Sequence, residues 1–159
     1  MNNLPERRAA ESRTEQIQIV MPGYTNGNGR LFGGKLVAWM DVVAAVTARR
    51  HARRDVTTVS IDNLQFKKAA YVNDTIVLVG QLTHVGVTSM EVRVDAFAER
   101  MDGEKELVNR AYFTLVALDG HERPTPVPRL LPETEEERAE WEAGTRRTEL
   151  RLQRRIEQF

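Results

Sequence analysis

The amino-acid sequence predicts an α+β fold, in which a curved antiparallel sheet of about five strands wraps around one long apolar helix and a helical tail follows. Three observations support it: a helical segment over 34–52 that is apolar on nearly every side, a series of strand-like runs on both sides of that segment, and a charged helical pattern near the C-terminus. A helix without a polar face is usually buried. Because one sheet covers only part of such a helix, we expect a second subunit to cover the rest.

Composition limits the class of protein. The chain has 159 residues, 41% of them hydrophobic and 29% charged, which fits one folded domain. Its formal net charge of zero argues against a general nucleic-acid binder. The absence of cysteine excludes disulfides, a catalytic thiol and thiolate metal sites. The N-terminus has no apolar signal run and no stretch of about 18 apolar residues could span a membrane, so we expect a cytoplasmic protein.

The first part of the chain leads into the long helix. Residues 1–14 are polar, and we expect them to be flexible. Residues 15–21 alternate between apolar and polar side chains, as in a strand that ends at Pro22. Residues 23–34 form the loop GYTNGNGRLFGG, which holds five of the ten glycines and can bring its backbone close to a ligand.

Four strand-like runs follow the helix, over residues 56–66, 75–85, 88–99 and 105–118. Short connections join the last three, which predicts an antiparallel meander from 75 to 118. Residues 120–132 are a Pro-rich linker, and residues 133–158 read as a charged helix with a break at Gly144. We therefore predict a globular domain over residues 15–119 and a linker with a helical tail over 120–159.

Asp41 interrupts the apolar helix and is the acidic residue that requires an explanation. No other acidic residue lies between Gly29 and Asp55. It lies about two turns from the helix start, too far in to cap it. Burial of a lone carboxylate is costly unless something pairs with it, and such a group suits acid–base chemistry. A narrow polar stripe facing water, or a structural pairing with an arginine, is the alternative explanation.

The loop before the helix adds a second candidate feature. Gly33 and Gly34 precede the first helical turn, whose N–H groups lack intrahelical partners and suit a developing oxyanion. Asn26 and Asn28 supply amides that can orient a water or a carbonyl group. Asn and Gly also serve simply to make turns, so the loop favours a site only in combination with Asp41.

The run TNGNGRLFGGKLVAWMDVVAAVTARRHA, over residues 25–52, resembles the signature of the acyl-CoA thioester hydrolases of hotdog fold. That pattern reads Asn-x-x-Gly-x-x-x-Gly-Gly, followed by a helix that carries Met-Asp. It is matched here by Asn26, Gly29, Gly33, Gly34, Met40 and Asp41. The resemblance continues in TTVSIDNLQFKKAAYVNDTIVL and VGVTSMEVRV and covers about residues 15–119. It implies a hotdog fold and the hydrolysis of acyl-CoA to a free carboxylic acid and coenzyme A.

The resemblance also implies roles. Asp41 matches the family's catalytic carboxylate, which either activates a water molecule or attacks the thioester carbonyl itself. Asn26 matches the catalytic asparagine that acts from the neighbouring protomer, although Asn28 stands close enough to compete for that assignment. The N–H groups near Gly33 and Gly34 match the oxyanion hole. A homodimer would then be the catalytic unit, and many members assemble further into a trimer of dimers.

The coenzyme A phosphates need cationic side chains or free backbone donors. Our candidates are Arg30, Lys67 and Lys68, together with the turn that contains Gly86, Thr88 and Ser89. Two adjacent lysines are also typical of a solvated strand end. No cofactor is expected beyond the coenzyme A of substrate and product. No metal is expected either, because none of the three histidines has a metal-ligand spacing with another.

Two other classes of protein compete with the enzyme. A non-catalytic acyl-CoA-binding regulator or carrier of the same fold should lack the carboxylate and usually carries a DNA-binding segment. This sequence keeps Asp41 and shows no helix-turn-helix before residue 15. A structural protein assembled through its tail helix would leave the glycine-rich loop and Asp41 unexplained. The sequence therefore favours the thioesterase, with a preferred acyl chain length that the sequence leaves open.

Overall fold

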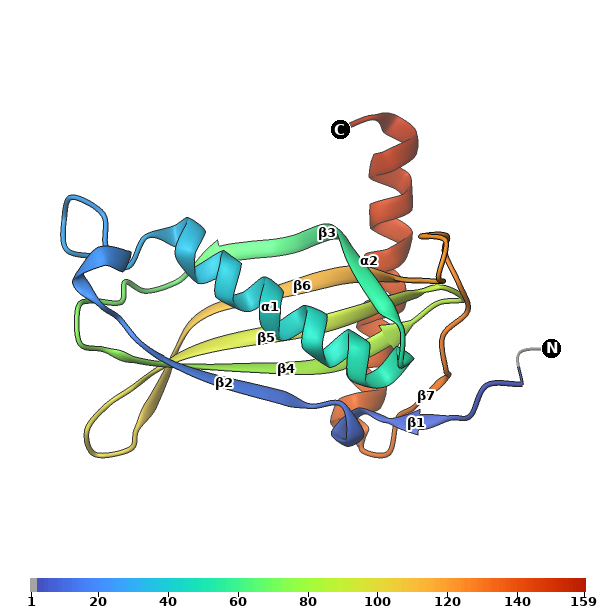
Figure 1. Cartoon of the computed structure of the whole chain (residues 1–159), viewed down its shortest axis with the longest axis horizontal. Coiled ribbons are helices and arrows are strands. Elements are labelled where there is room, and N and C mark those ends of the chain that lie inside the picture. The colour runs from blue at the N-terminus through green and yellow to red at the C-terminus, as the bar shows by residue number, and fades with distance from the viewer. Residues whose placement is uncertain (1–2) are drawn as a thin grey trace.

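The computed structural model describes residues 3–159, arranged as one sheet, two long helices and several short elements (Figure 1). The strands are β1 (Arg7–Arg8), β2 (Thr14–Ile19), β3 (Asp55–Phe66), β4 (Thr75–Val85), β5 (Ser89–Glu99), β6 (Lys105–Leu118) and β7 (Leu130–Leu131). The helices are η1 (Ala9–Glu11), η2 (Pro22–Tyr24), α1 (Gly33–Ala52) and α2 (Glu135–Glu157). Within residues 3–159, no helix has the length and apolar character needed to cross a membrane.

The main sheet has the strand order β2-β4-β5-β6-β3, and every neighbouring pair in it is antiparallel. This confirms the predicted sheet and the meander from residue 75 to 118, with α1 lying across one face of the sheet (Figure 1). The first strand ends two residues earlier than predicted. Val20 leaves the ladder because its backbone pairs with the turn at residues 73–74, where Val20 N donates to Asp74 O and Val20 O accepts from Asn73 N, each at 2.9 Å.

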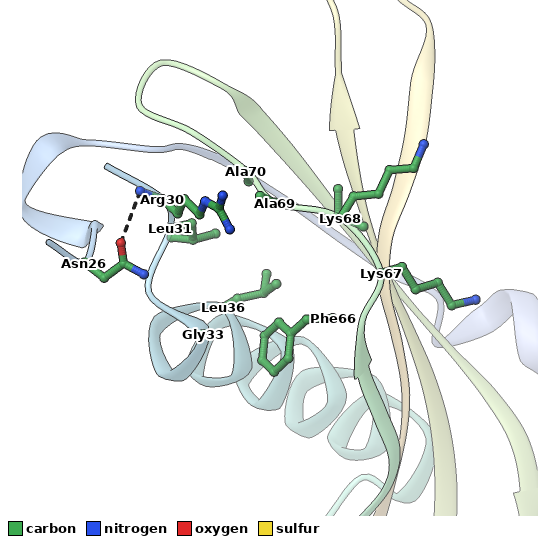
Figure 2. A pocket seen from close by; sticks show the side chains of 11 residues that line it. Asn26, Arg30, Leu31, Gly33, Leu36, Phe66, Lys67, Lys68, Ala69 and Ala70 are labelled. Atoms are coloured by element: carbon green, nitrogen blue, oxygen red, sulfur yellow. Dashed lines mark hydrogen bonds between the residues drawn. The ribbon is translucent and has the colours of Figure 1, made fainter. Parts of the chain in front are cut away.

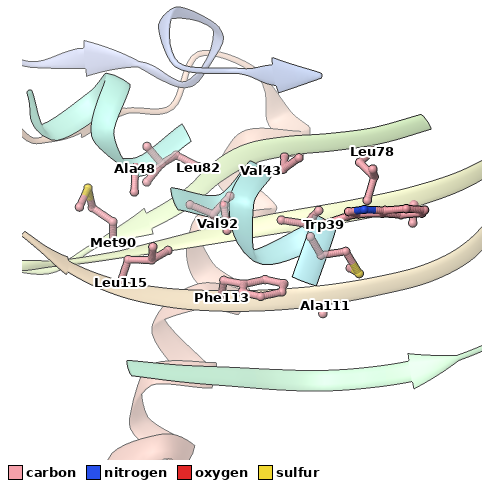
Figure 3. Packing of buried hydrophobic residues seen from close by; sticks show 14 of the residues in the cluster. Trp39, Val43, Ala48, Leu78, Leu82, Met90, Val92, Ala111, Phe113 and Leu115 are labelled. Atoms are coloured by element: carbon pink, nitrogen blue, oxygen red, sulfur yellow. The ribbon is translucent and has the colours of Figure 1, made fainter. Parts of the chain in front are cut away.

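The core lies between α1 and the sheet (Figure 3). Buried side chains of α1 pack on inward-facing side chains of β4, β5 and β6, among them Met40, Val43, Ala44, Leu78, Val92 and Phe113. Gly80 allows the helix to approach β4 closely, because a Cβ atom there would lie 2.6 Å from Thr47 Oγ1 and 2.8 Å from Val43 Cγ1. The opposite side of α1 stays uncovered, and Val42 is 54% exposed. The single chain therefore leaves part of the apolar surface of α1 uncovered.

The N-terminal segment contains more regular structure than its polar sequence indicated. Arg7 and Arg8 form a short parallel ladder with Leu130 and Leu131 of the Pro-rich linker. Ala9, in the turn that follows, is 2% exposed. One small apolar residue in a polar run gives no periodic signal, so this contact was not visible in the sequence.

The predicted break at Gly144 is wrong, since α2 runs without interruption from Glu135 to Glu157. Gly144 faces the sheet, where a Cβ atom would lie 2.7 Å from His84 Cβ and 3.0 Å from Glu91 Oε1. Beside it, the Trp141 ring packs on the His84 ring with 4.4 Å between centroids. The glycine therefore permits close packing of α2 on the outer face of the sheet, opposite α1.

Charged side chains hold α2 on that outer face. Glu91 is 2% exposed and accepts hydrogen bonds from Thr83 Oγ1 at 2.7 Å and from two nitrogens of Arg147 at 3.0 and 2.8 Å. The Arg147 guanidinium also lies 3.7 Å from the centroid of the Tyr112 ring. A buried carboxylate needs this complete pairing, because its isolated charge would be strongly destabilising. Further along α2, Arg151 pairs with Asp62 of β3 at 3.0 Å.

Replacement of Gly144 by alanine should destabilise the protein. Gly→Ala in a helix ordinarily stabilises by roughly 0.5–1 kcal/mol. Here the added methyl group would overlap His84 Cβ, and we expect a net loss of about 1–3 kcal/mol in the free energy of unfolding. Urea unfolding of Gly144→Ala and of the exposed control Thr145→Ala would measure it. Equal or greater stability of Gly144→Ala would contradict the packing role.

Stability should also fall when the pH drops below about 6.5. Burial is the main cause that lowers the pKa of His84 and of His51 below the ordinary histidine value. As the pH falls through the unfolded-state pKa, the unfolded chain binds protons that the folded chain does not, so the folded state loses stability. Urea unfolding at pH 7.5 and 5.5 would measure the loss, which should be smaller in His84→Gln. An equal loss in both proteins would exclude His84 as a cause.

Candidate active site

The glycine-rich loop before α1 is folded around the side chain of Asn26. Asn26 Oδ1 accepts hydrogen bonds from the backbone N–H groups of Asn28 at 3.0 Å and Arg30 at 3.3 Å. The Asn26 N–H in turn donates to Arg30 O at 2.8 Å, and Gly29 closes the turn with a φ of 71°. The side-chain oxygen of Asn26 is thus occupied by hydrogen bonds within the loop, while the amide nitrogen Nδ2 can donate to a ligand. This geometry places the Asn26 side chain at the centre of the loop, to which Asn28 contributes its backbone N–H.

The start of α1 presents backbone donors beside this loop. Phe32 occupies the N-cap position and makes no side-chain cap. The N–H groups of Gly33 and Gly34 belong to the first turn, where an α-helix has no internal acceptors. Gly33 also lies against Phe66 at the end of β3, since a Cβ atom there would be 2.9 Å from the Phe66 ring. Both donors therefore lie at the positive end of the α1 dipole, with an aromatic ring next to them.

A pocket of about 410 Å³ opens between the loop, the start of α1 and the end of β3. Figure 2 shows Asn26 and Arg30 on one side of it and Phe66 close to the helix start. Its lining residues are Asn26, Arg30, Leu31, Gly33, Leu36, Phe66, Lys67, Lys68, Ala69, Ala70 and Val108. The pocket therefore combines an apolar interior with three cationic side chains, as a ligand with an apolar and an anionic part requires.

The pocket brings together half of the predicted site residues, namely Asn26, Arg30, Gly33, Lys67 and Lys68. Lys68 is engaged by Glu106, and this hydrogen bond lowers the pKa of the Glu106 carboxyl group. The Lys67 side chain extends away from Asn26 (Figure 2). Arg30 is thus the cation that the loop carries closest to the Asn26 side chain.

Asp41 lies outside this pocket, farther along α1. Its carboxylate is only partly buried, because it borders the exposed strip of the helix that contains Ala38 and Val42. Thr58 of β3 donates a hydrogen bond from Oγ1 to Asp41 Oδ1 at 2.7 Å. One oxygen of the carboxylate is therefore fixed by the neighbouring strand, at the surface that a single chain leaves bare.

Sequence reasoning missed Thr58. The alternation of strand 56–66 places Thr58 on one of two faces, but it does not say which residue of α1 stands opposite. That pairing depends on how the helix crosses the sheet, so only the folded chain identifies Thr58 as the residue that orients Asp41.

The turn with Gly86, Thr88 and Ser89 lies at the other end of the sheet, near the C-terminus of α1 (Figure 1). Gly86 N donates to Ser89 O at 2.8 Å, and Thr88 O accepts from Ala117 N at 3.0 Å. Within one chain this turn is not part of the pocket at Asn26. Among residues 3–159, no group of histidine, aspartate and glutamate side chains is placed to hold a metal ion.

Comparison with known proteins supports the same class of enzyme. Residues 28–104 match the family model of the thioesterase superfamily. The chain is 44% identical over 135 residues to the uncharacterized acyl-CoA thioester hydrolase YkhA of Bacillus subtilis. The aligned region covers 84% of this chain and 78% of that protein.

Solved structures of acyl-CoA thioesterases resemble this chain over nearly its whole length. An apo-hexameric acyl-CoA thioesterase has 41% identity and a TM-score of 0.91, with 95% of this chain and 97% of that chain covered. The acyl-CoA hydrolase of Staphylococcus aureus, solved with butyryl coenzyme A, coenzyme A and coenzyme A disulfide, has 34% identity and a TM-score of 0.92, with 97% and 94% covered. Variants of that enzyme with an aspartate, an asparagine or a threonine replaced by alanine were also solved.

The long helix on a five-stranded antiparallel sheet is thus the hotdog fold. The chain belongs to the thioesterase superfamily and, within it, to the acyl-CoA thioester hydrolases.

Replacement of Thr58 should lower turnover without removing substrate binding. Thr58→Val deletes the hydrogen bond to Asp41 while it keeps the shape of the side chain. A hydrogen bond to a charged group is worth about 1.5–3 kcal/mol, so kcat should fall by roughly 10- to 100-fold. Thr58→Ser keeps the hydroxyl group and should keep most of the activity. Unchanged kcat in a folded Thr58→Val variant would show that the bond does not serve catalysis.

Proposed function

We propose that this protein hydrolyses acyl-CoA thioesters with Asp41 of one protomer and Asn26 of the neighbouring protomer. The observation that carries the proposal is the Asp41 carboxylate, held by Thr58 at the uncovered surface of α1. Within the part of the chain that the structure describes, the Asp41 carboxylate accepts this hydrogen bond through one of its two oxygens. It becomes functional when a second subunit closes over it and supplies the remaining groups.

The alanine variants of the Staphylococcus aureus enzyme support this choice of residues. The replaced asparagine, aspartate and threonine are separated by 15 and 17 positions in that chain. Asn26, Asp41 and Thr58 are separated by the same 15 and 17 positions here. At 34% identity over nearly the full length, this agreement supports corresponding places in the site.

The arrangement of β3 supports a dimer as the catalytic unit. β3 is an edge strand of the sheet, with Val59 56% exposed and Ile61 39% exposed. Its partner would pair antiparallel along this edge, so that the two chains share one continuous sheet. Such pairing brings the pocket at the end of β3 in one chain next to the partner's α1 C-terminal end, where the turn at Gly86 lies. The candidate substrate-binding groups at the two ends of the sheet, one end from each chain, then lie in one site.

The reaction needs a base, an oxyanion hole and a leaving-group proton. Asp41 would take a proton from a water molecule that the amide of the partner's Asn26 helps to position. The hydroxide attacks the thioester carbonyl carbon, and the N–H groups of Gly33 and Gly34 stabilise the oxyanion. The C–S bond then breaks, and the proton held by Asp41 passes to the thiolate of coenzyme A. The alternative is direct attack by Asp41 on the thioester carbonyl carbon, which releases the thiolate and forms an anhydride that water then hydrolyses.

The rest of the pocket suits the two ends of the substrate. The apolar side chains of Leu31, Leu36 and Phe66 would contact the acyl or pantetheine chain. Arg30 and Lys67, with Lys68 already engaged by Glu106, would attract the phosphates. No cofactor takes part in this scheme. By analogy with the hexameric relatives we propose a trimer of dimers, and we expect it in the cytoplasm.

Asp41→Asn should abolish hydrolysis but not folding or substrate binding. Loss of a general base or a nucleophile typically costs 100- to 10,000-fold in rate. The release of free thiol from acyl-CoAs of increasing length, from acetyl to palmitoyl, would measure the activity of the wild type and of the variant. It would also identify the preferred acyl chain length. Transfer of ¹⁸O from labelled water into Asp41 during turnover would identify the nucleophilic route. A wild type that binds acyl-CoA and releases no thiol would favour the regulator instead.

Mixed oligomers should test whether the site is shared between protomers. Asp41→Asn and Asn26→Ala should each be inactive alone. In a hybrid dimer one site carries both changes and the other carries neither, so co-expression at equal levels should restore about a quarter of wild-type activity. A mixture as inactive as the two parents would place Asp41 and Asn26 in the same protomer's site.

A further inference from the structure

Asn109 of β6 carries a polar side chain that is buried without a hydrogen-bond partner. Its exposed fraction is 0%. Within residues 3–159, neither Nδ2 nor Oδ1 of this side chain has a partner. An unpaired buried amide is destabilising, and native proteins rarely keep a buried polar group that nothing binds. The burial of Asn109 therefore indicates a polar partner that the single chain does not itself supply.

The strand register places the Asn109 side chain on the face of the sheet that α1 covers. Asn109 pairs with Ala96 of β5 and with Phe66 of β3. Ala96 is buried in the core, and the Phe66 ring lies against Gly33 at the start of α1. Paired residues on neighbouring strands project to the same face of a sheet. The Asn109 amide therefore lies between the sheet and the N-terminal part of α1.

This position borders the pocket at the start of α1. Val108, which precedes Asn109, and Phe66, its partner across the ladder, both line that pocket. Figure 2 shows Phe66 beside Leu36 at the helix start. The Phe66 side chain is 56% exposed, so little packing holds its ring, and exposed side chains change rotamer within nanoseconds. Rotation of that ring would extend the pocket to the Asn109 amide.

The acyl group of the substrate suits this inner end of the pocket. Arg30 and Lys67 are exposed, whereas Leu36 and Val108 are buried. The charged phosphates would stay hydrated beside the exposed cations, so the acyl chain takes the buried end. A plain alkyl chain there would leave both polar atoms of Asn109 unpaired. A hydroxyl group on the chain can donate to Oδ1 and accept from Nδ2.

We propose that Asn109 selects hydroxyacyl-CoA substrates, by hydrogen bonds between its side-chain amide and a hydroxyl group on the acyl chain. The inference rests on the hydrolysis of acyl-CoA proposed above and names the substrate class of that same site. A site that binds a substrate hydroxyl rejects the analogue without it, because the polar groups of the site are then left unpaired. The kcat/KM of the wild type should therefore be roughly 10- to 100-fold higher for the hydroxylated acyl-CoA than for its unsubstituted analogue.

Asn109→Leu tests the proposal, with Thr114→Val as its matched control. Leucine keeps the size of the side chain and removes both polar atoms. Thr114 Oγ1 is likewise buried without a partner among the described residues, but it lies on the opposite face of β6, where Thr114 pairs with Glu91. Thiol release would be measured on butyryl-CoA and hexanoyl-CoA, each unsubstituted and with a hydroxyl group at each carbon beyond the α-carbon. The preference for a hydroxylated chain should disappear in Asn109→Leu and persist in Thr114→Val.

Thermal unfolding adds a readout that separates selectivity from folding. Asn109→Leu should be at least as stable as the wild type, since leucine leaves no polar atom unpaired. A lower Tm with an unchanged preference would overturn the proposal, because the amide would then be a structural group.

Two further outcomes would also overturn the selection by Asn109. One is a wild type that prefers no hydroxylated chain over its unsubstituted analogue. The other is an Asn109→Leu variant whose kcat/KM falls equally on every substrate, because the amide would then contact the coenzyme A part that all of them share. A wild type that releases no thiol from any acyl-CoA would instead refute the proposed hydrolysis itself.

Discussion

The packing of α1 on a single sheet is the constraint from which the rest of the structure follows. Met40, Val43 and Ala44 are buried against the sheet, and Gly80 of β4 brings the helix close enough for Thr47 and Val43 to touch the strand. One sheet can cover only one side of a cylinder. The same helix therefore presents Val42 to solvent, and part of its apolar side stays uncovered in the single chain.

The uncovered side of α1 suits the proposed chemistry. Asp41 borders the exposed side of α1, where closure by a second subunit would exclude water and strengthen every electrostatic interaction with the carboxylate. Thr58 holds one carboxylate oxygen, so Asp41 has a defined orientation before a substrate arrives. Hydrogen bonds to the Asn26 side chain hold the loop, and the backbone bond from Phe32 N to Tyr24 O at 2.8 Å holds the start of α1. Preorganised donors of this kind need no rearrangement during the reaction.

The outer face of the sheet differs from the apolar face under α1, because it is polar where α2 covers it. Glu91 is nearly inaccessible and would be strongly destabilising without Thr83 and Arg147. Such a network sets the position and direction of a helix more narrowly than apolar contacts alone, because few arrangements satisfy every charge. It directs α2 across the strands and past β3, which is why the end of the helix reaches the edge where a second copy would pair.

The sequence by itself determined the types of the main helices and strands, the strand limits at 75–85 and 105–118, and the glycine-rich loop that leads into an apolar helix bearing Asp41. These features depend on local periodicity and on a local motif, which a linear chain displays directly. Tertiary structure alone decided that Thr58 holds Asp41, that Gly144 packs on His84 instead of breaking α2, and that the turn at Gly86 stands far from the pocket at Asn26. Those relations join residues distant in sequence, and their partners exist only once the helices have been placed on the sheet.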